Sequence, residues 1–183
     1  MNSKQANAQA RLFLALWPDQ AAQAKLTDHV RQWRWSDAAQ RYGQQDWHVT
    51  LHFIGSVPRQ RLAELRAGLA VPVLPFALQL RRPEIWRQGL ALLAPETVPE
   101  NLLLLQAELG LALKRLGLPT EDRVFRPHLT LARRAAGSQA PTQVLDLGWT
   151  VKGYSLVEST GDPLQRYRQI EHFGHSRIIR PNP

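Results

Sequence analysis

A four-residue pattern, His-x-Thr-Leu, occurs twice in this chain, once in each half. The first copy spans residues 48–51 (HVTL) and the second spans residues 128–131 (HLTL). Both copies lie in short stretches that read as strands, where residues i and i+2 point to the same face. Each copy therefore places an imidazole and a hydroxyl on one side and two aliphatic side chains on the other. Two copies predict a duplicated unit that brings both His/Thr pairs to a shared centre.

Chance explains one copy of this pattern more readily than two. With random residue placement, roughly one chain in fifty of this length would hold a single copy, and two are far rarer. Coincidental strand patterning around structural histidines is the alternative interpretation. The four other histidines are His29, His52, His172 and His175. A structural role is the more frequent case for such residues, although the strand alternation puts His52 on the face of His48.

The chain is strongly basic. Its 183 residues include 23 Lys and Arg against 15 Asp and Glu, which gives a net charge of +8 and a pI near 10.8. Such a charge is typical of proteins that bind nucleic acid or other polyanions, and a solvated Arg-rich surface would give the same total. The absence of cysteine excludes disulfides and thiolate metal sites. It is also compatible with a reducing compartment, and we expect a cytoplasmic protein without a membrane span.

Hydrophobic periodicity divides the chain into strands and helices. Apolar or alternating runs predict strands over residues 11–17, 47–55, 73–82, 85–86, 90–94, 127–133, 149–158 and 166–173. One-sided apolar spacing predicts helices over residues 20–35 and 59–70. A third helix is expected over residues 99–116, where leucines nearly encircle the segment and predict burial on all sides. Too few helices separate the strands for a doubly wound parallel sheet, so we expect an α+β fold with largely antiparallel strands and outer helices. One domain is expected over residues 11–177, between a flexible tail at 1–10 and a C-terminal tail at 178–183.

Two facing imidazoles suit in-line displacement at phosphorus. With unperturbed pKa values of about 6.5, one ring can be protonated and the other neutral near neutral pH, which supplies a general acid and a general base. His48 and His128 are the candidate catalytic residues. Thr50 and Thr130 could donate hydrogen bonds to non-bridging phosphate oxygens as charge develops there. This chemistry needs no metal or cofactor, although two histidines alone could seed a zinc site.

The doubled motif resembles the 2H phosphoesterases, and within them the RNA 2′,3′-cyclic phosphodiesterases first described as 2′-5′ RNA ligases. Supporting context comes from the segments RLFLAL (11–16), FIG (53–55) and FRP (125–127). The likeness extends over residues 11 to 177. The resemblance implies a bilobed α+β fold of two pseudo-symmetric halves, each with an antiparallel sheet, around a central cleft that holds both motifs.

The resemblance also implies metal-independent opening of a 2′,3′-cyclic phosphate at an RNA end to give a 2′-phosphate, with a weak reverse 2′-5′ ligation. It implies that His48 is the acid that protonates the departing 3′ oxygen and His128 is the base. The implied partner is an RNA end with a cyclic phosphate, and we expect a monomer without an obligate protein partner.

Three further residues are candidates for substrate contacts. Arg133 follows the second motif, where RNA phosphodiesterases of this family commonly have an arginine that could clamp phosphate. Strand alternation, however, puts Arg133 on the face opposite His128 unless the strand ends or twists. Tyr167 could stack on a base or pack in the core. Phe125 could likewise line the cleft or pack in the core. Trp86 is expected in the core.

Two alternatives to the RNA phosphodiesterase stay open. One is a phosphodiesterase of the same superfamily for small cyclic nucleotides or ADP-ribose 1″,2″-cyclic phosphate. The other is a non-catalytic RNA-binding module that keeps the scaffold. Two intact His/Thr pairs argue against the second alternative, because a pure binding module does not need two imidazoles.

Overall fold

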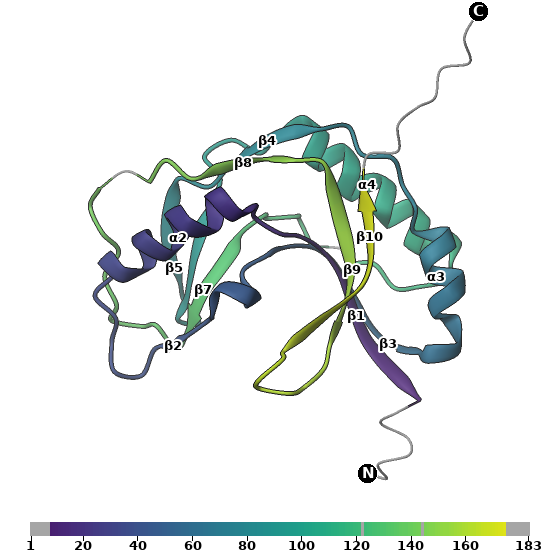
Figure 1. The fold of residues 1–183 in the computed structure, drawn as a ribbon, viewed down its shortest axis with the longest axis horizontal. Helices are drawn as coiled ribbons and strands as arrows, with labels where there is room; N and C mark the ends of the chain where they lie inside the picture. The colour runs from purple at the N-terminus through teal and green to yellow at the C-terminus, as the bar shows by residue number, and fades with distance from the viewer. Residues whose placement is uncertain (1–7, 122, 144, 175–183) are drawn as a thin grey trace, which may run out of the picture.

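Antiparallel pairing joins most strands of the chain into one curved sheet of eight strands (Figure 1). The computed structural model describes residues 8–121, 123–143 and 145–174. Within them the strands are β1 (Gln9–Leu16), β2 (Gln40–Arg41), β3 (Val49–Pro58), β4 (Phe76–Gln79), β5 (Arg82–Trp86), β6 (Leu90–Ala94), β7 (Leu129–Arg133), β8 (Gly148–Val151), β9 (Gly153–Ser159) and β10 (Tyr167–Gly174). The α-helices are α2 (Gln20–Gln32), α3 (Leu62–Gly68) and α4 (Glu100–Arg115), with short 3-10 turns at η1 (Gln44–Asp46) and η2 (Arg59–Arg61).

The large sheet consists of two halves that meet at a single residue pair. The first half has the strand order β10-β9-β1-β3, and the second has the order β7-β6-β5, with β2 also paired to β7. Val49 of β3 pairs with Leu129 of β7, and this is the one register pair between the halves. In Figure 1 the two halves diverge as separate arms, with β9 and β10 on the right and β5 and β7 on the left. The predicted bilobed antiparallel α+β fold is confirmed.

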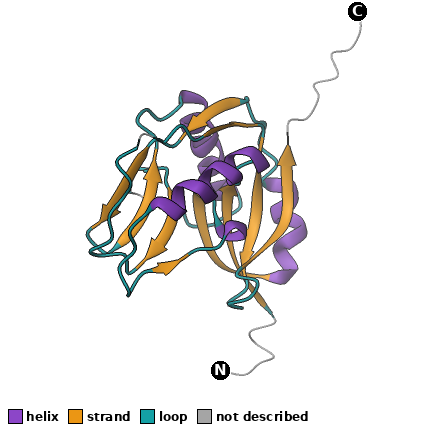
Figure 2. Cartoon of the chain, turned by 60° about the vertical axis from the view of Figure 1, so that its left-hand side comes forward, coloured by secondary structure: helices purple, strands orange, loops and turns teal. Residues whose placement is uncertain are grey.

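The helices lie outside the large sheet, as Figure 2 shows from the side. Helix α2 begins where the Asp19 carboxylate accepts a hydrogen bond from the Ala22 amide at 2.9 Å, which is the expected N-cap. It ends at Gln32 rather than at residue 35. The backbone of Arg34 instead exchanges two hydrogen bonds with Gln139, at 2.8 and 3.0 Å, and this bridge requires an extended chain. No helix among the described residues is long and apolar enough to cross a bilayer.

Several strand boundaries differ from those predicted. Strand β1 begins at Gln9, so residues 9 and 10, assigned to the flexible tail, belong to the sheet, and Ala10 is buried. The stretch predicted as one strand over 149–158 is two strands, β8 and β9, which belong to different sheets. Gly153 begins β9 beside Phe173, and a Cβ atom there would lie 2.4 Å from the Phe173 carbonyl oxygen. This close approach admits only glycine.

The predicted strand over 73–82 is likewise shorter, because β4 pairs with β8 in a separate two-stranded sheet before the chain enters β5. Strand β2 lies between the predicted helix over 20–35 and the predicted strand over 47–55, in a stretch for which no strand was predicted. The C-terminal tail predicted over 178–183, and residues 175–177 of the predicted domain, lie outside the described residues.

Helix α4 packs against the first half of the sheet through one face. The buried residues of that face are Leu102, Leu105, Leu109, Ala112 and Leu113. The leucines that nearly encircle the helix predicted burial all round, but Leu103, Leu104 and Leu111 are 45 to 49% exposed. The helix is therefore amphipathic in packing although its sequence is apolar on most sides.

Candidate active site

The two motifs meet where the halves of the sheet meet. Val49 and Leu129, the residues directly after the two histidines, are the pair that joins β3 to β7. His48 and His128 therefore enter the junction side by side from opposite directions. Their charges interact, because a positive charge on His128 lowers the pKa of His48. The sequence prediction that both histidines share one centre agrees with this geometry.

Each motif contains a β-bulge at its leucine. In the pairing of β3 with β1, Ala15 lies opposite Thr50 and Leu14 lies opposite His52, so Leu51 is an extra residue without a partner. The second copy repeats the irregularity against β6, where Leu92 and Ala91 lie opposite Thr130 and Ala132, and Leu131 is the extra residue. A bulge shifts the alternation of side chains along the rest of its strand. The same shift at the same motif position supports an internal duplication.

The bulges decide where the residues after each motif point. In each strand the second residue after the threonine is buried, and the third is exposed: His52 and Phe53 in β3, Ala132 and Arg133 in β7. Phe53 and Arg133 therefore rejoin the face of the threonines. Strand alternation alone put Arg133 on the face opposite His128, and the bulge returns it to the face of Thr130. His52 is turned away from the face of His48, contrary to the sequence prediction.

The two imidazoles are held by equivalent hydrogen bonds. Nδ1 of His48 lies 2.7 Å from the carbonyl oxygen of Asp46, and Nδ1 of His128 lies 2.7 Å from that of Arg126. A carbonyl oxygen can only accept, so Nδ1 is the protonated nitrogen that donates in both rings. This fixes the tautomer and leaves Nε2 of each ring available to accept or donate a proton.

The His48 ring is enclosed by aromatic side chains. It stacks on Trp17 at 5.1 Å between ring centroids, lies 5.0 Å from Phe13, and meets Tyr167 in a T-shaped contact at 4.9 Å. Burial lowers the pKa of His48 to about 4, partly opposed by the hydrogen bond to the Asp46 carbonyl. Tyr167 therefore contacts the predicted catalytic ring directly.

His128 has a different neighbourhood. Its ring lies 4.7 Å from that of Trp86, and the guanidinium of Arg126 covers Trp86 at 4.5 Å. The indole N–H of Trp86 donates to Glu84 at 2.8 Å. Burial lowers the pKa of His128, and the cations Arg123 and Arg126 act in the same direction. The prediction that Trp86 is a core residue is wrong, because its ring is half-buried beside His128 and its N–H needed a polar partner.

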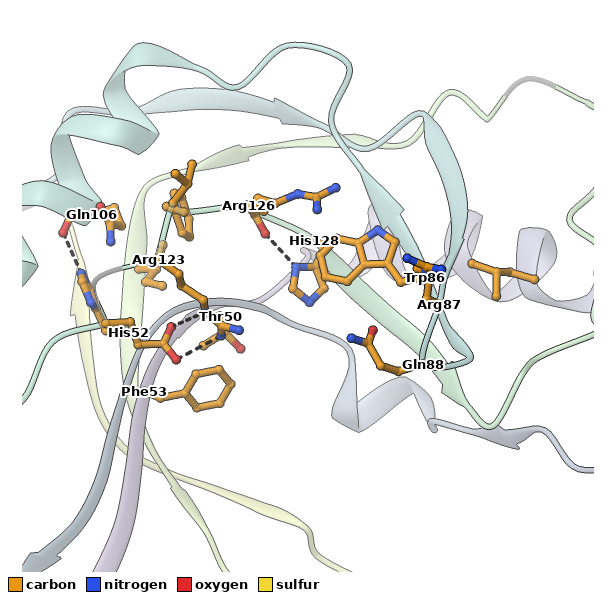
Figure 3. A pocket seen from close by; sticks show the side chains of 15 residues that line it. Thr50, His52, Phe53, Trp86, Arg87, Gln88, Gln106, Arg123, Arg126 and His128 are labelled. Atoms are coloured by element: carbon orange, nitrogen blue, oxygen red, sulfur yellow. Dashed lines mark hydrogen bonds and ion pairs between the residues drawn. The ribbon is translucent and has the colours of Figure 1, made fainter.

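A pocket of about 640 Å³ opens beside His128 (Figure 3). Its lining includes Thr50, His128 and the predicted cleft residue Phe125. In Figure 3 Phe53 lies on one side of the pocket, while His128 and Trp86 lie on the other. His48, Thr130, Arg133 and Tyr167 are not part of its lining. The pocket is thus one side of the site, and His48, Tyr167 and Arg133 belong to the other.

The side of the site at His48 carries a cluster of charged and phenolic groups. The guanidinium of Arg166 lies 5.1 Å from the centre of the Tyr42 ring, and that of Arg133 lies 6.0 Å from it. Arg166 also pairs with Asp46 at 3.6 Å. Burial raises the pKa of Tyr167 to about 12, with Tyr42 and Asp46 adding to the effect and the two arginines opposing it. Tyr167 therefore belongs to this cluster as well as to the surroundings of His48.

The remaining described histidines make structural contacts. His29 accepts a hydrogen bond from the Trp33 indole at 3.1 Å, and His172 lies 3.1 Å from the Ser155 hydroxyl. Nε2 of His52 lies 2.7 Å from the Gln106 carbonyl of α4, which ties β3 to that helix. His175 lies outside the described residues. Within the described part of the chain no group of three or more His, Asp or Glu side chains could hold a metal ion.

A model of the 2′-5′ RNA ligase superfamily matches residues 17–163 of the chain. The chain belongs to this superfamily. It is 31% identical over 175 residues to a Thermus thermophilus protein named RNA 2′,3′-cyclic phosphodiesterase, covering 84% of this chain and 83% of that protein. A Bacillus subtilis protein of the same name is 23% identical over 139 residues, covering 70% of this chain and 76% of the relative.

Solved structures of other proteins have the same fold as this superfamily member. Escherichia coli LigT in complex with 3′-AMP superposes with a TM-score of 0.80 at 23% identity, covering 92% of this chain and 99% of that one. A crystal structure of a Thermus thermophilus protein gives a TM-score of 0.75 at 28% identity, covering 90% and 97%. The resemblance on which the sequence analysis relied is confirmed.

Sequence reasoning did not single out Arg126 and Phe53 as site residues of this superfamily member. Arg126 is two residues before the second histidine, where its carbonyl orients the ring and its side chain covers Trp86. Phe53 is five residues after the first histidine, the position that Arg133 occupies after the second. The signal available was the repeat itself, because aligning the two copies pairs Phe53 with Arg133.

Proposed function

We propose that the protein hydrolyses RNA 2′,3′-cyclic phosphate ends to 2′-phosphomonoesters, with His48 and His128 as the acid and base. The observation that supports this most strongly is the matched pair of imidazoles at the junction, each with Nδ1 tied to a backbone carbonyl and Nε2 left for the substrate. Two curated relatives named RNA 2′,3′-cyclic phosphodiesterase support the substrate class.

The pocket beside His128 is the proposed seat of the terminal nucleobase. Phe53 offers a ring that is 49% exposed, and Arg126 and Trp86 form a stacked pair opposite it. Base stacking on aromatic rings and on guanidinium planes is the usual way in which proteins hold unpaired bases. A pocket of this size accepts a base and leaves the ribose at its mouth, close to Thr50 and His128.

The stereochemistry of ribose then orients the cyclic phosphate. The base is attached at the carbon next to C2′, and C5′ is attached at the carbon next to C3′. A base beside His128 therefore directs O2′ towards His128 and O3′ towards His48. An in-line water enters opposite O3′, from the side of His128. We assign His128 as the base and His48 as the acid.

In this scheme the water proton passes to Nε2 of His128 as the water oxygen attacks phosphorus. The bond from phosphorus to O3′ breaks, and O3′ takes a proton from Nε2 of His48, which leaves a 2′-phosphate and a free 3′ hydroxyl. Thr50 and Thr130 donate hydrogen bonds to the non-bridging oxygens. A ribose 5′ hydroxyl in place of water, acting on the same cyclic phosphate, gives the proposed weak 2′-5′ ligation.

The protonation state follows from burial. Both pKa values are lowered in the free protein, His48 to about 4, whereas the sequence-level expectation used an unperturbed value near 6.5. His48 therefore gains its proton together with the substrate, because a phosphate anion against Nε2 stabilises the imidazolium. The optimum of kcat/KM, which reports the free enzyme, should lie at lower pH than the optimum of kcat.

Assays on two substrates test the proposal. An oligoribonucleotide with a 2′,3′-cyclic phosphate end should be opened to the 2′-phosphate in the presence of EDTA. Hydrolysis of ADP-ribose 1″,2″-cyclic phosphate in preference to RNA ends would assign the small-molecule alternative, and RNA binding without turnover would assign the non-catalytic one. Loss of activity in EDTA that zinc restores would contradict the metal-free scheme.

A further inference from the structure

The two sides of the site have the same backbone but different side chains at equivalent positions. Two residues before the histidine stands Arg126 on one side and Asp46 on the other. Five residues after the histidine stands Phe53 in the first motif and Arg133 in the second. Phe53 lines the pocket beside His128, whereas Arg133 lies in the cluster beside His48. The duplication has therefore left a pocket with Phe53 and Trp86 beside His128, and the arginines Arg133 and Arg166 beside His48.

The cluster beside His48 has more positive than negative groups. Arg133 and Arg166 approach the same Tyr42 ring, and the carboxylate of Asp46 is the acidic group beside them. Within the described residues Arg133 makes no ion pair shorter than 4.0 Å, and its contact is with the ring of Tyr42. Arg166 is 45% exposed, and its pair with Asp46 is long at 3.6 Å. Both guanidinium groups thus keep free N–H donors for an anion.

The direction of the bound nucleoside connects this cluster to the substrate. With the base beside His128, C5′ and its phosphodiester extend on the O3′ side, towards His48 and the arginines beyond it. The cyclic phosphate itself lies between the two Nε2 atoms and the threonines. The group that reaches the arginines is therefore a different phosphate, the one on the 5′ side of the terminal nucleoside.

We propose that Arg133 and Arg166, which both lie against the ring of Tyr42, bind the 5′ phosphate of the terminal nucleotide. This inference rests on the proposed function and adds the means by which the site distinguishes an RNA end from a cyclic mononucleoside. The 3′-terminal nucleotide of an RNA always carries a phosphate on its 5′ oxygen, whereas a nucleoside 2′,3′-cyclic phosphate has none there. Guanidinium groups suit this role because their planar donors pair with two phosphate oxygens at once.

A pair of substrates that differ in one group isolates the second phosphate. Adenosine 2′,3′-cyclic phosphate is compared with its 5′-phosphorylated form by kcat/KM. The wild type should favour the 5′-phosphorylated substrate, and Arg166→Gln should lower that preference about ten-fold, the loss expected for one charge-assisted contact. Arg115→Gln, at the exposed end of α4, removes the same charge far from the cluster and should keep the wild-type preference.

Arg166→Lys separates charge from geometry, because lysine keeps the charge but not the planar fork that covers Tyr42. It should retain part of the preference. Equal losses of kcat/KM on both substrates in Arg166→Gln would place the arginine at the cyclic phosphate and overturn the second site. So would a wild-type protein that treats the two substrates alike.

Binding of two product analogues tests the second site without turnover. Dissociation constants of adenosine 2′-phosphate and adenosine 2′,5′-bisphosphate are measured by calorimetry on the wild type and on Arg166→Gln. The bisphosphate should bind more tightly to the wild type, with the advantage largely lost in the variant. If neither cyclic substrate is hydrolysed, the proposed function fails, and this comparison still decides the second site. An unchanged ratio of dissociation constants in the variant overturns it.

Discussion

The half-sites around His48 and His128 are alike in backbone and unlike in side chains. Both have a bulge at the motif leucine, and both hold the ring through a carbonyl two residues earlier. His48, however, is packed among three aromatic rings next to a charged cluster, whereas His128 borders a pocket lined by Phe53 and Trp86. The backbone therefore repeats one histidine geometry in both halves, as the proposed pair of proton transfers requires. The differing side chains make the two ends of the site distinguishable, so that an asymmetric substrate can bind in one orientation.

The two half-sites share an imidazole, and removing either one should cause the largest loss of activity. His48→Ala and His128→Ala should each lower kcat/KM on an RNA cyclic phosphate by about 10²- to 10⁴-fold, because each abolishes one proton transfer. Thermal melting of both variants checks that they fold. Substantial activity in either folded variant contradicts paired acid and base catalysis.

Replacing the hydroxyls tests whether the two halves contribute alike to the phosphate. Thr50→Val and Thr130→Val keep the shape of the side chain and remove one donor each. Each should lower kcat by about 10²-fold, the scale found when one oxyanion donor is lost. A loss confined to one variant would mean that a single half grips the phosphate.

Truncating Phe53 tests whether the half-site at His128 is the one that binds the nucleobase. Phe53→Ala removes the proposed stacking surface and should raise KM for a cyclic-phosphate-ended RNA by about ten-fold with little change in kcat, since base stacking is worth about 1–3 kcal/mol. Phe53→Tyr serves as the matched control, because it keeps the ring. If Phe53→Ala changes kcat and not KM, the nucleobase does not lie in this pocket.

The smallest expected effect is on stability against acid. The folded-state pKa of His48 is about 4, below its unfolded value near 6.5, so the unfolded chain binds its proton first as the pH falls. His48 thus supports full stability above about pH 6.5 and loses that contribution progressively down to about pH 4. His48→Gln, which keeps an N–H donor and does not titrate, should lose less Tm between pH 7 and pH 4.5 than the wild type, by about 5 to 10 °C. Parallel Tm curves would show that burial of His48 has no such cost.

The features that depend on local sequence patterns could be predicted from the sequence alone. The repeat identified His48 and His128, and the apolar pattern of the segments predicted the three α-helices and the α+β class. The bulges were beyond it, because an extra residue at Leu51 or Leu131 is a property of pairing with another strand and leaves no mark in the strand's own alternation. That omission explains why the alternation put His52 on the face of His48 and Arg133 on the opposite face.

Trp86 and Arg126 show a second limit of sequence reasoning. An isolated tryptophan among strand residues reads as core, and only the turn between β5 and β6 brings its ring against His128. The guanidinium of Arg126 joins it from a segment without regular structure. Contacts between segments that are far apart in the sequence decide both positions. The duplicated motif locates the centre of the site, whereas its walls depend on the fold.

The central claim is that both imidazoles act on one phosphate, and a crystal structure with a bound nucleoside 2′-phosphate tests it most directly. A single phosphate should have Nε2 of His48 and Nε2 of His128 each about 3 Å from one of its oxygens, with the base beside Phe53. A phosphate that contacts one ring while the other Nε2 faces elsewhere would contradict it.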